Sequence, residues 1–171
     1  MTSVALLGTG TLGSAIAQRF LAQGLDVHVW NRDSSRTAPL IDLGAIAITD
    51  LQTATHDCHS IVTVLTNGAV TTEVVAALGP LNGSTLISMG TMGLSESKAL
   101  ATQVLLQKGS YLEAPVLGSK PQALSGSLLV MAGGDAAVFG RQLELLRRLS
   151  QQPKLVGPVG SGAATKLALN Q

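Results

Sequence analysis

Short apolar runs alternate with longer amphipathic segments along most of the chain, and Gly, Asn, Asp or Ser stands at most of the joins between them. The short runs are typical of strands that are buried on both faces, whereas the longer segments carry apolar residues at helical spacing. This alternation predicts βαβ units and a parallel sheet. We expect strands at 4–7, 27–30, 45–48, 61–65, 86–89 and 111–113.

The segments between these strands predict helices. The first, 11–23, has an apolar stripe, and Gly24 follows it as a C-terminal stop. Further helices are expected from residues 34, 71 and 95. After Glu113 we expect a loop rich in Gly, Pro and Ser through 126, a strand at 128–132, a helix at 135–149, a strand near 155 and a helix that opens at 163. This last helix reaches Gln171 without a cap, so we expect it to continue beyond this chain.

Composition and charge narrow the class of protein. The chain has 171 residues, 46% of them apolar, and 11 basic residues almost balance 10 acidic ones. This length predicts one domain, and the balanced charge gives no electrostatic basis for binding nucleic acid. The single cysteine, Cys58, cannot close an intrachain disulfide. No secretory signal follows Met1, and no apolar run approaches the ~20 residues that span a bilayer, so we expect a cytoplasmic protein without a membrane partner.

A glycine-rich motif stands between the first predicted strand and the first predicted helix. Gly8, Gly10 and Gly13, with Thr11 and Leu12 between the last two, match G-x-G-x-x-G. In this context the first glycine allows a tight turn, the second lets a pyrophosphate approach the backbone, and the third lets helix and strand pack closely. The amides of the helix N-terminus then bind the phosphates. The motif predicts a dinucleotide site, and the alternative is a glycine-rich turn without a ligand.

The residues after the second predicted strand suggest which dinucleotide binds. An NAD site usually has an acidic residue there to bind the ribose hydroxyls, but this chain has Asn31 and Arg32. A guanidinium pairs well with a 2′-phosphate, and Ser34 can add a hydroxyl donor. NADP(H) is therefore the expected cofactor and NAD(H) a possible one. In the alternative interpretation Arg32 is a solvated turn residue and Asp33 binds the ribose.

Residue types that commonly bind metal ions cluster at one place, where His56, Cys58 and His59 fall within four residues. Their spacing fits no common zinc pattern, and no second pair of ligands follows downstream. We therefore expect no metal site.

Four segments in order resemble the β-hydroxyacid dehydrogenase family: 8–13, the turn Asn31-Arg32, 113–119 and 160–170. The resemblance covers essentially the whole chain, and within the family it is greatest to glyoxylate/succinic semialdehyde reductases. It implies a Rossmann-type, doubly wound, mostly parallel α/β fold that binds NADP(H). In this family a long helix joins that domain to an all-helical domain, absent from this chain, which completes the active site and usually dimerises. The expected organisation is thus a cofactor domain at 1–162 and the start of the inter-domain helix at 163–171.

The resemblance also implies roles for particular residues. Lys166 and Asn170 are four positions apart, so they share one face of the predicted helix and could reach one substrate carbonyl. The family motif makes them the candidate catalytic residues, with Lys166 as general acid. Leu65, which ends the fourth predicted strand, and Thr91, after the fifth, are candidate cofactor contacts. Thr91 can equally be an ordinary loop threonine.

The predicted substrate segment is Leu117, Gly118 and Ser119, and it departs from the family at one position. The residue after Ala-Pro-Val is usually a serine that holds the substrate carboxylate, but here it is Leu117. Ser119 could supply the hydroxyl instead, or the pocket could accept a less polar carbonyl or an imine.

The sequence therefore predicts the cofactor-binding half of an NADPH-dependent reductase that acts on a small aldehyde or 2-oxo acid. We expect the isolated chain to be poorly active and any homo-oligomer to form through the helical domain. Two alternatives stay open: a non-catalytic dinucleotide-binding module, for which Lys166 would have no chemical use, and an imine reductase-like enzyme.

Overall fold

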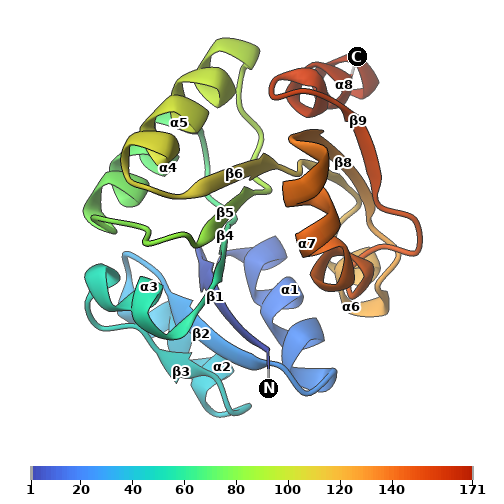
Figure 1. Cartoon of the computed structure of the whole chain (residues 1–171). Helices are drawn as coiled ribbons and strands as arrows, with labels where there is room; N and C mark the ends of the chain where they lie inside the picture. The colour runs from blue at the N-terminus through green and yellow to red at the C-terminus, as the bar shows by residue number, and fades with distance from the viewer. Residues whose placement is uncertain (1, 171) are drawn as a thin grey trace.

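The computed structural model describes residues 2–170 and contains the expected alternation of strands and helices (Figure 1). The strands in this part of the chain are β1 Ser3–Leu7, β2 Asp26–Trp30, β3 Ile46–Ala47, β4 Ser60–Thr63, β5 Thr85–Ser88, β6 Ser110–Glu113, β7 Val116–Leu117, β8 Leu129–Gly134 and β9 Lys154–Gly157. The α-helices are α1 Thr11–Ala22, α2 Ala38–Ile41, α3 Ala54–Asp57, α4 Gly68–Ala77, α5 Leu94–Leu106, α6 Lys120–Ser125, α7 Ala136–Arg147 and α8 Ser161–Leu169. Two 3₁₀ helices, η1 Ser34–Thr37 and η2 Leu51–Thr53, precede α2 and α3.

All these strands belong to one mostly parallel sheet. Six of them run parallel in the order β3-β2-β1-β4-β5-β6. Beyond β6 the direction changes, because β8 pairs antiparallel with β6 and β7, and β9 pairs parallel with β8. The chain leaves β1 toward β2 on one side and returns to β4 on the other, which makes the carboxyl ends of β1 and β4 a topological switch point. The predicted Rossmann-type fold is thus confirmed.

The two faces of the sheet bury two separate apolar cores. Along β1 the side chains of Val4 and Leu6 face one core, in which Phe20 of α1 is fully buried. Ala5 and Leu7 face the other core, which α4 and α5 cover with residues such as Val75. This alternation, with both faces covered, explains why the parallel strands appear in the sequence as continuous apolar runs. In residues 2–170 no helix is long and apolar enough to cross a membrane.

The region predicted as a loop through residue 126 contains two elements. β7 is held by antiparallel pairing of Val116 with Val130. Ser119 is the N-cap of α6, and its N–H and hydroxyl both donate to Gln122 Oε1 at 2.9 Å. Gly126, with φ = +73°, ends the helix. A two-residue strand and a six-residue helix are too short to show an apolar period, so the pattern missed them.

Three predicted helices begin differently in the structure, and local caps explain two of these differences. The segment from Ser34 forms η1 before the short α2, because Asp33 caps a 3₁₀ turn. The helix expected from 71 begins at Gly68, where the Asn67 side chain accepts the Val70 N–H at 2.9 Å. The final helix begins at Ser161 rather than at 163.

Candidate functional site

The turn between β1 and α1 places the three motif glycines in different surroundings. Gly8 adopts φ = +104°, and a Cβ there would collide with the Val64 carbonyl oxygen. A Cβ at Gly13 would collide with the Gly8 carbonyl oxygen. Gly10 differs, because beyond its neighbours in the chain no described atom lies within 4 Å of the place where its Cβ would stand. The protein's own packing requires glycine at positions 8 and 13, whereas the open space beside Gly10 suits a ligand that approaches the backbone closely.

The N-terminus of α1 begins at the same turn. Gly10 precedes the helix and has no side chain to cap it. Amides of a first helical turn lack partners within the helix, and they bind phosphate oxygens well. Thr11 and Leu12 open this turn, with an exposed and a half-buried side chain respectively. We therefore expect them to contact a phosphate through their backbone amides.

An open cleft of about 220 Å³ lies beside the turn. Its wall comes from residues that follow the carboxyl ends of β1, β2 and β4, and from α4. The cleft brings together these residues predicted to bind the cofactor: Gly8, Gly10, Asn31, Arg32 and Leu65. The other predicted contacts, Thr11, Leu12, Gly13, Ser34 and Thr91, are not part of its described wall. Arg36 does line the cleft, and the available signal was a second arginine four residues after Arg32.

The Asn31 side chain ties the glycine turn to the segment after β2. Its Oδ1 accepts the Thr9 N–H at 3.1 Å, and its Nδ2 donates to the Asp33 carbonyl oxygen at 3.1 Å. Thr9 adds a third link, because its hydroxyl donates to the Arg36 carbonyl oxygen at 3.3 Å. These bonds fix the spacing between the glycine turn and the two arginines.

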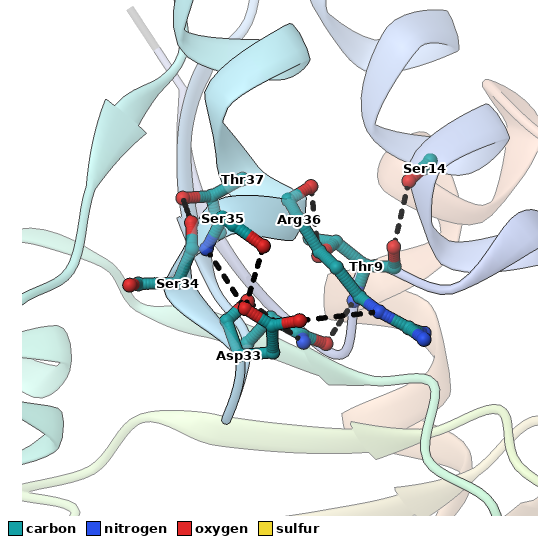
Figure 2. Close-up of polar contacts among 8 residues, drawn as sticks. Thr9, Ser14, Asp33, Ser34, Ser35, Arg36 and Thr37 are labelled. Atoms are coloured by element: carbon teal, nitrogen blue, oxygen red, sulfur yellow. Dashed lines mark hydrogen bonds and ion pairs between the residues drawn. The ribbon is translucent and has the colours of Figure 1, made fainter.

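The Asp33 carboxylate is directed at its own turn (Figure 2). Its Oδ1 accepts the Ser35 hydroxyl at 2.6 Å and the Ser35 N–H at 3.1 Å, and its Oδ2 lies 3.8 Å from Arg36 Nε. The bonds from Ser35, together with the nearby Arg36 charge, hold the pKa of Asp33 below its usual value. Ser34 is exposed, and its carbonyl oxygen accepts the Thr37 hydroxyl at 2.7 Å. Asp33 therefore acts as the cap of η1.

Arg32 reaches from the end of β2 toward α4. Its guanidinium lies 3.4 Å from the Glu73 carboxylate, and Val70 and Val74 of the same helix line the cleft. The Arg32 and Glu73 side chains are 65% and 73% exposed. Such a pair is weak in water, so an anionic ligand in the cleft can compete for the guanidinium.

Lys166 of α8 lies near the carboxyl ends of β5 and β6, since it lines a small cavity together with Ser88 and Glu113. Its Nζ donates to the Val116 carbonyl oxygen at 2.8 Å, and partial burial lowers the pKa of Lys166 below its usual value. Val116 directly precedes Leu117, so the lysine lies beside the predicted substrate segment. Leu117 is half-buried, whereas the Ser119 hydroxyl caps α6 as described above.

Two neighbouring loops lie between the cleft and Lys166. Lys166 and Gly90 line a small cavity of about 10 Å³, which also contacts Ser88 and Tyr111. A Cβ at Gly90 would stand 2.7 Å from the carbonyl oxygen of Leu65, which lines the cleft. The loops after β4 and β5 are therefore in close contact, and together they connect the cleft to the lysine.

Three further candidates, Thr91, Gly118 and Asn170, are exposed and do not line this cavity. Thr91 directly follows Gly90 in the loop after β5. Asn170 follows the last residue of α8, and its N–H donates to the Lys166 carbonyl oxygen at 3.2 Å.

One buried residue at this end was not predicted to have a role of its own. Glu113, the last residue of β6, is only 2% exposed, and its carboxylate accepts backbone N–H groups at the start of α8. It appeared in the sequence only as part of a family segment. The signal that could have found it is an acidic residue at the end of a buried strand, which needs hydrogen-bond donors from elsewhere in the fold.

The His/Cys cluster does not form a metal site in the described residues, where no group of three His, Cys, Asp or Glu could hold an ion. His56 and His59 are exposed, whereas Cys58 is buried. Burial raises the pKa of the Cys58 thiol to about 12.

Comparison with known proteins decides the family. The family model described as the NAD binding domain of 6-phosphogluconate dehydrogenase matches residues 3–159. The chain belongs to that family. Glyoxylate/succinic semialdehyde reductase 2 of Arabidopsis thaliana is 31% identical over 98% of this chain and 48% of its own length. The Escherichia coli 2-hydroxy-3-oxopropionate reductase is 30% identical over 95% of this chain and 57% of its own length.

Among solved structures, an imine reductase from Pseudomonas sp. aligns with a TM-score of 0.94 at 25% identity, over 99% of this chain and 60% of that one. The chain thus spans about half to three fifths of the length of these relatives. The resemblance to β-hydroxyacid dehydrogenases that the motifs indicated is confirmed.

Proposed function

We propose that this chain is the cofactor-binding part of an NADPH-dependent oxidoreductase that reduces a small aldehyde or 2-oxo acid. The observation that carries the proposal is the adjacency of two features. The cleft beside Gly10 and the Lys166 amine lie along one edge of the sheet, and the contact between Gly90 and Leu65 connects them. A dinucleotide with its pyrophosphate at Gly10 can extend along that edge toward the lysine.

Charge in the cleft supports NADPH as the cofactor. Arg32 and Arg36 both line it, and guanidinium groups bind phosphate with charge-assisted hydrogen bonds. The Asp33 carboxylate, the alternative ribose ligand, already accepts two hydrogen bonds from Ser35. Ser34 is exposed in the same turn, where its hydroxyl can add a donor to a 2′-phosphate.

The chemistry that we assign to the chain's own residues is proton transfer. A dinucleotide held at Gly10 and Arg32 would supply a hydride from its nicotinamide, and the negative charge that would develop on the substrate oxygen calls for a proton donor. The Lys166 ammonium donates a proton to that oxygen, and its lowered pKa makes it a stronger acid than an exposed lysine. Asn170, one helical turn later, is the second candidate to hold the oxygen through its amide. A module without catalysis would have no need for this lysine.

A second candidate function, imine reduction, is favoured by one observation. Leu117 stands where β-hydroxyacid dehydrogenases usually have serine, and it is half-buried next to the carbonyl that holds Lys166. An apolar side chain there suits a substrate without a carboxylate. The solved imine reductase with a TM-score of 0.94 supports this alternative at the level of the fold and family.

Cofactor titration tests the proposal on the chain itself. Trp30 is the single tryptophan and lines the cleft, so its fluorescence should respond to a bound dinucleotide. We expect NADPH to bind about 10- to 100-fold more tightly than NADH, as one charge-assisted contact of ~1.5–3 kcal/mol implies. Equal affinities, or tighter binding of NADH, would contradict the assignment of NADPH.

A further inference from the structure

The Glu113 carboxylate lies where β6, α5 and the start of α8 meet, and it is 2% exposed. Its Oε1 accepts N–H groups from Gly160 at 2.8 Å, Gly162 at 2.6 Å and Ala163 at 3.4 Å. Its Oε2 accepts the hydroxyl of Ser97 on α5. No ion pair to Lys, Arg or His accompanies these bonds in the part of the chain that the structure describes. One oxygen of the carboxylate is therefore satisfied by a helix N-terminus, which favours negative charge, and the other by a hydroxyl.

Glycines make room for this arrangement. A Cβ at Gly133 would collide with Glu113 Oε1, and a Cβ at Gly162 would stand 3.1 Å from the same atom. Gly160 has φ = +100°, a left-handed conformation that directs the chain so that its own N–H and that of Gly162 reach one oxygen. The backbone around Glu113 is thus shaped to admit the carboxylate.

The other oxygen of Glu113 is held from α5. The single Ser97 proton is donated to Glu113, so the Ser97 oxygen accepts from the Tyr111 hydroxyl at 2.9 Å. Burial raises the pKa of Tyr111 to about 12, which keeps this hydroxyl a donor. The carboxylate is therefore fixed from both sides, by α5 through one oxygen and by α8 through the other.

Two contacts join the same pair of segments. Glu113 holds the first turn of α8 at Ala163, and Lys166, three residues later, donates to Val116, three residues after Glu113. The carboxylate contact thus anchors the first turn of α8 to the end of β6. Without it, the N–H groups of Gly160, Gly162 and Ala163 would lose this acceptor, and α8 has no side-chain cap of its own to replace it.

We propose that Glu113 is a positioning residue for Lys166: as the cap of α8 it fixes the helix so that the lysine amine stays at Val116, beside the predicted substrate segment. The inference rests on the proposed function, because Lys166 is the proton donor of that proposal. The contacts that carry it involve neither cofactor nor substrate, so it can fail or succeed separately.

The test follows the position and the pKa of Lys166 by NMR in the wild type and in Glu113→Gln. Glu144→Gln is the matched control, because it makes the same change at an exposed residue of α7 that pairs with Arg147. At a temperature where all three proteins are folded, we expect Glu113→Gln to lose the nuclear Overhauser contacts between the ε-protons of Lys166 and the protons of Pro115, which lines the same small cavity. The Lys166 pKa should rise toward its usual value as the amine becomes hydrated, whereas the control should match the wild type.

Two results would overturn the proposal. One is a folded Glu113→Gln protein that keeps both the contacts and the wild-type pKa of Lys166. The other is a fall in that pKa with the contacts intact, because this would show that Glu113, which lines the same small cavity as Tyr111 and Lys166, acts on the lysine through its charge.

If Glu113→Gln does not fold, hydrogen exchange of the backbone amides in the wild type tests whether Glu113 caps α8. We expect the Gly160 and Gly162 amides to exchange at least about tenfold more slowly than in an unstructured peptide, given the strength of hydrogen bonds to a charged acceptor. Unprotected amides at both positions would overturn the proposal. None of these measurements involves NADPH or turnover, so failure of the proposed function would show separately, in the cofactor titration.

Discussion

The two ends of the candidate site are built in opposite ways. At the cleft, residues 8–36 supply most of the functional groups from one βαβ unit, and the charged side chains of Arg32 and Glu73 are exposed. At the lysine end, the contacts join residues far apart in the chain, since 49 positions separate Gly162 from Glu113 and 50 separate Lys166 from Val116. The carboxylate that anchors this end is buried.

This difference suggests a division of labour. An exposed cleft can exchange a charged ligand, because its ion pairs are weak and the helix N-terminus beside it presents free backbone amides. A proton donor must be held to within a fraction of an ångström, which requires rigid contacts from several elements. Substitutions at the cleft should therefore change binding, whereas substitutions at the lysine end should change chemistry or local order.

The largest expected effect is on turnover. In a chimera that joins this chain to the remaining part of a close relative, Lys166→Ala should lower turnover about 10²- to 10⁴-fold, as loss of a general acid does. Asn170→Ala should cost less, and cofactor affinity should stay nearly unchanged in both variants. Single-turnover kinetics would separate hydride transfer from binding. Near-normal hydride transfer in the Lys166→Ala chimera would favour imine reduction or a non-catalytic role. This chain without the remaining part of the relative should turn over substrate poorly, whether or not Lys166 is replaced.

The next largest effect separates the glycines within the cleft. Gly13→Ala places a Cβ against the Gly8 carbonyl oxygen, so we expect a loss of about 2–4 kcal/mol in the free energy of unfolding. Gly10→Ala meets no atom within 4 Å and should leave that free energy within about 0.5 kcal/mol. It should nevertheless weaken NADPH binding at least about tenfold, because the methyl group occupies the space of the pyrophosphate. Urea denaturation and calorimetry measure the two quantities, and normal cofactor binding by Gly10→Ala would place the ligand elsewhere.

The sequence predicts the locally encoded cleft better than the lysine end, which depends on long-range contacts. Continuous apolar runs identify β1, β2 and β4 to β6, the helical spacing of apolar residues identifies the longer helices α1, α4, α5 and α7, and the spacing of the glycines identifies the turn after β1. Periodicity cannot reveal β7 or α6, which are too short. Nor can it reveal that Glu113 meets Gly162, because that contact depends on the three-dimensional path of the chain. The role of Arg36 depends on local structure instead, because the way in which Asp33 caps the turn decides whether this arginine faces the cleft.

Removal of Arg32 should abolish much of the preference for NADPH. Arg32→Ala deletes one charge-assisted contact, so we expect NADPH affinity to fall about 10- to 100-fold and NADH affinity to change little. Arg36→Ala provides a comparison, since Arg36 lines the same cleft but also pairs with Asp33. A uniform loss for both cofactors in Arg32→Ala would indicate that this arginine supports the turn rather than the phosphate.

The smallest effect concerns the ion pair at the cleft. The Glu73 carboxylate lies 3.4 Å from the Arg32 guanidinium and should compete with a 2′-phosphate for it. Glu73→Gln removes this competition and the repulsion between carboxylate and phosphate. Because the pair is exposed and screened, NADPH affinity should rise only about two- to fivefold at low salt, and the gain should fade as salt increases. The affinity for NADH, which lacks the 2′-phosphate, should change less. The control Glu144→Gln breaks a similarly exposed ion pair on α7 and should leave the affinities for both cofactors unchanged. Weaker NADPH binding by Glu73→Gln would instead mean that Glu73 orients Arg32 for the phosphate, and the pair would then belong to the binding site as a positioning contact rather than a competitor.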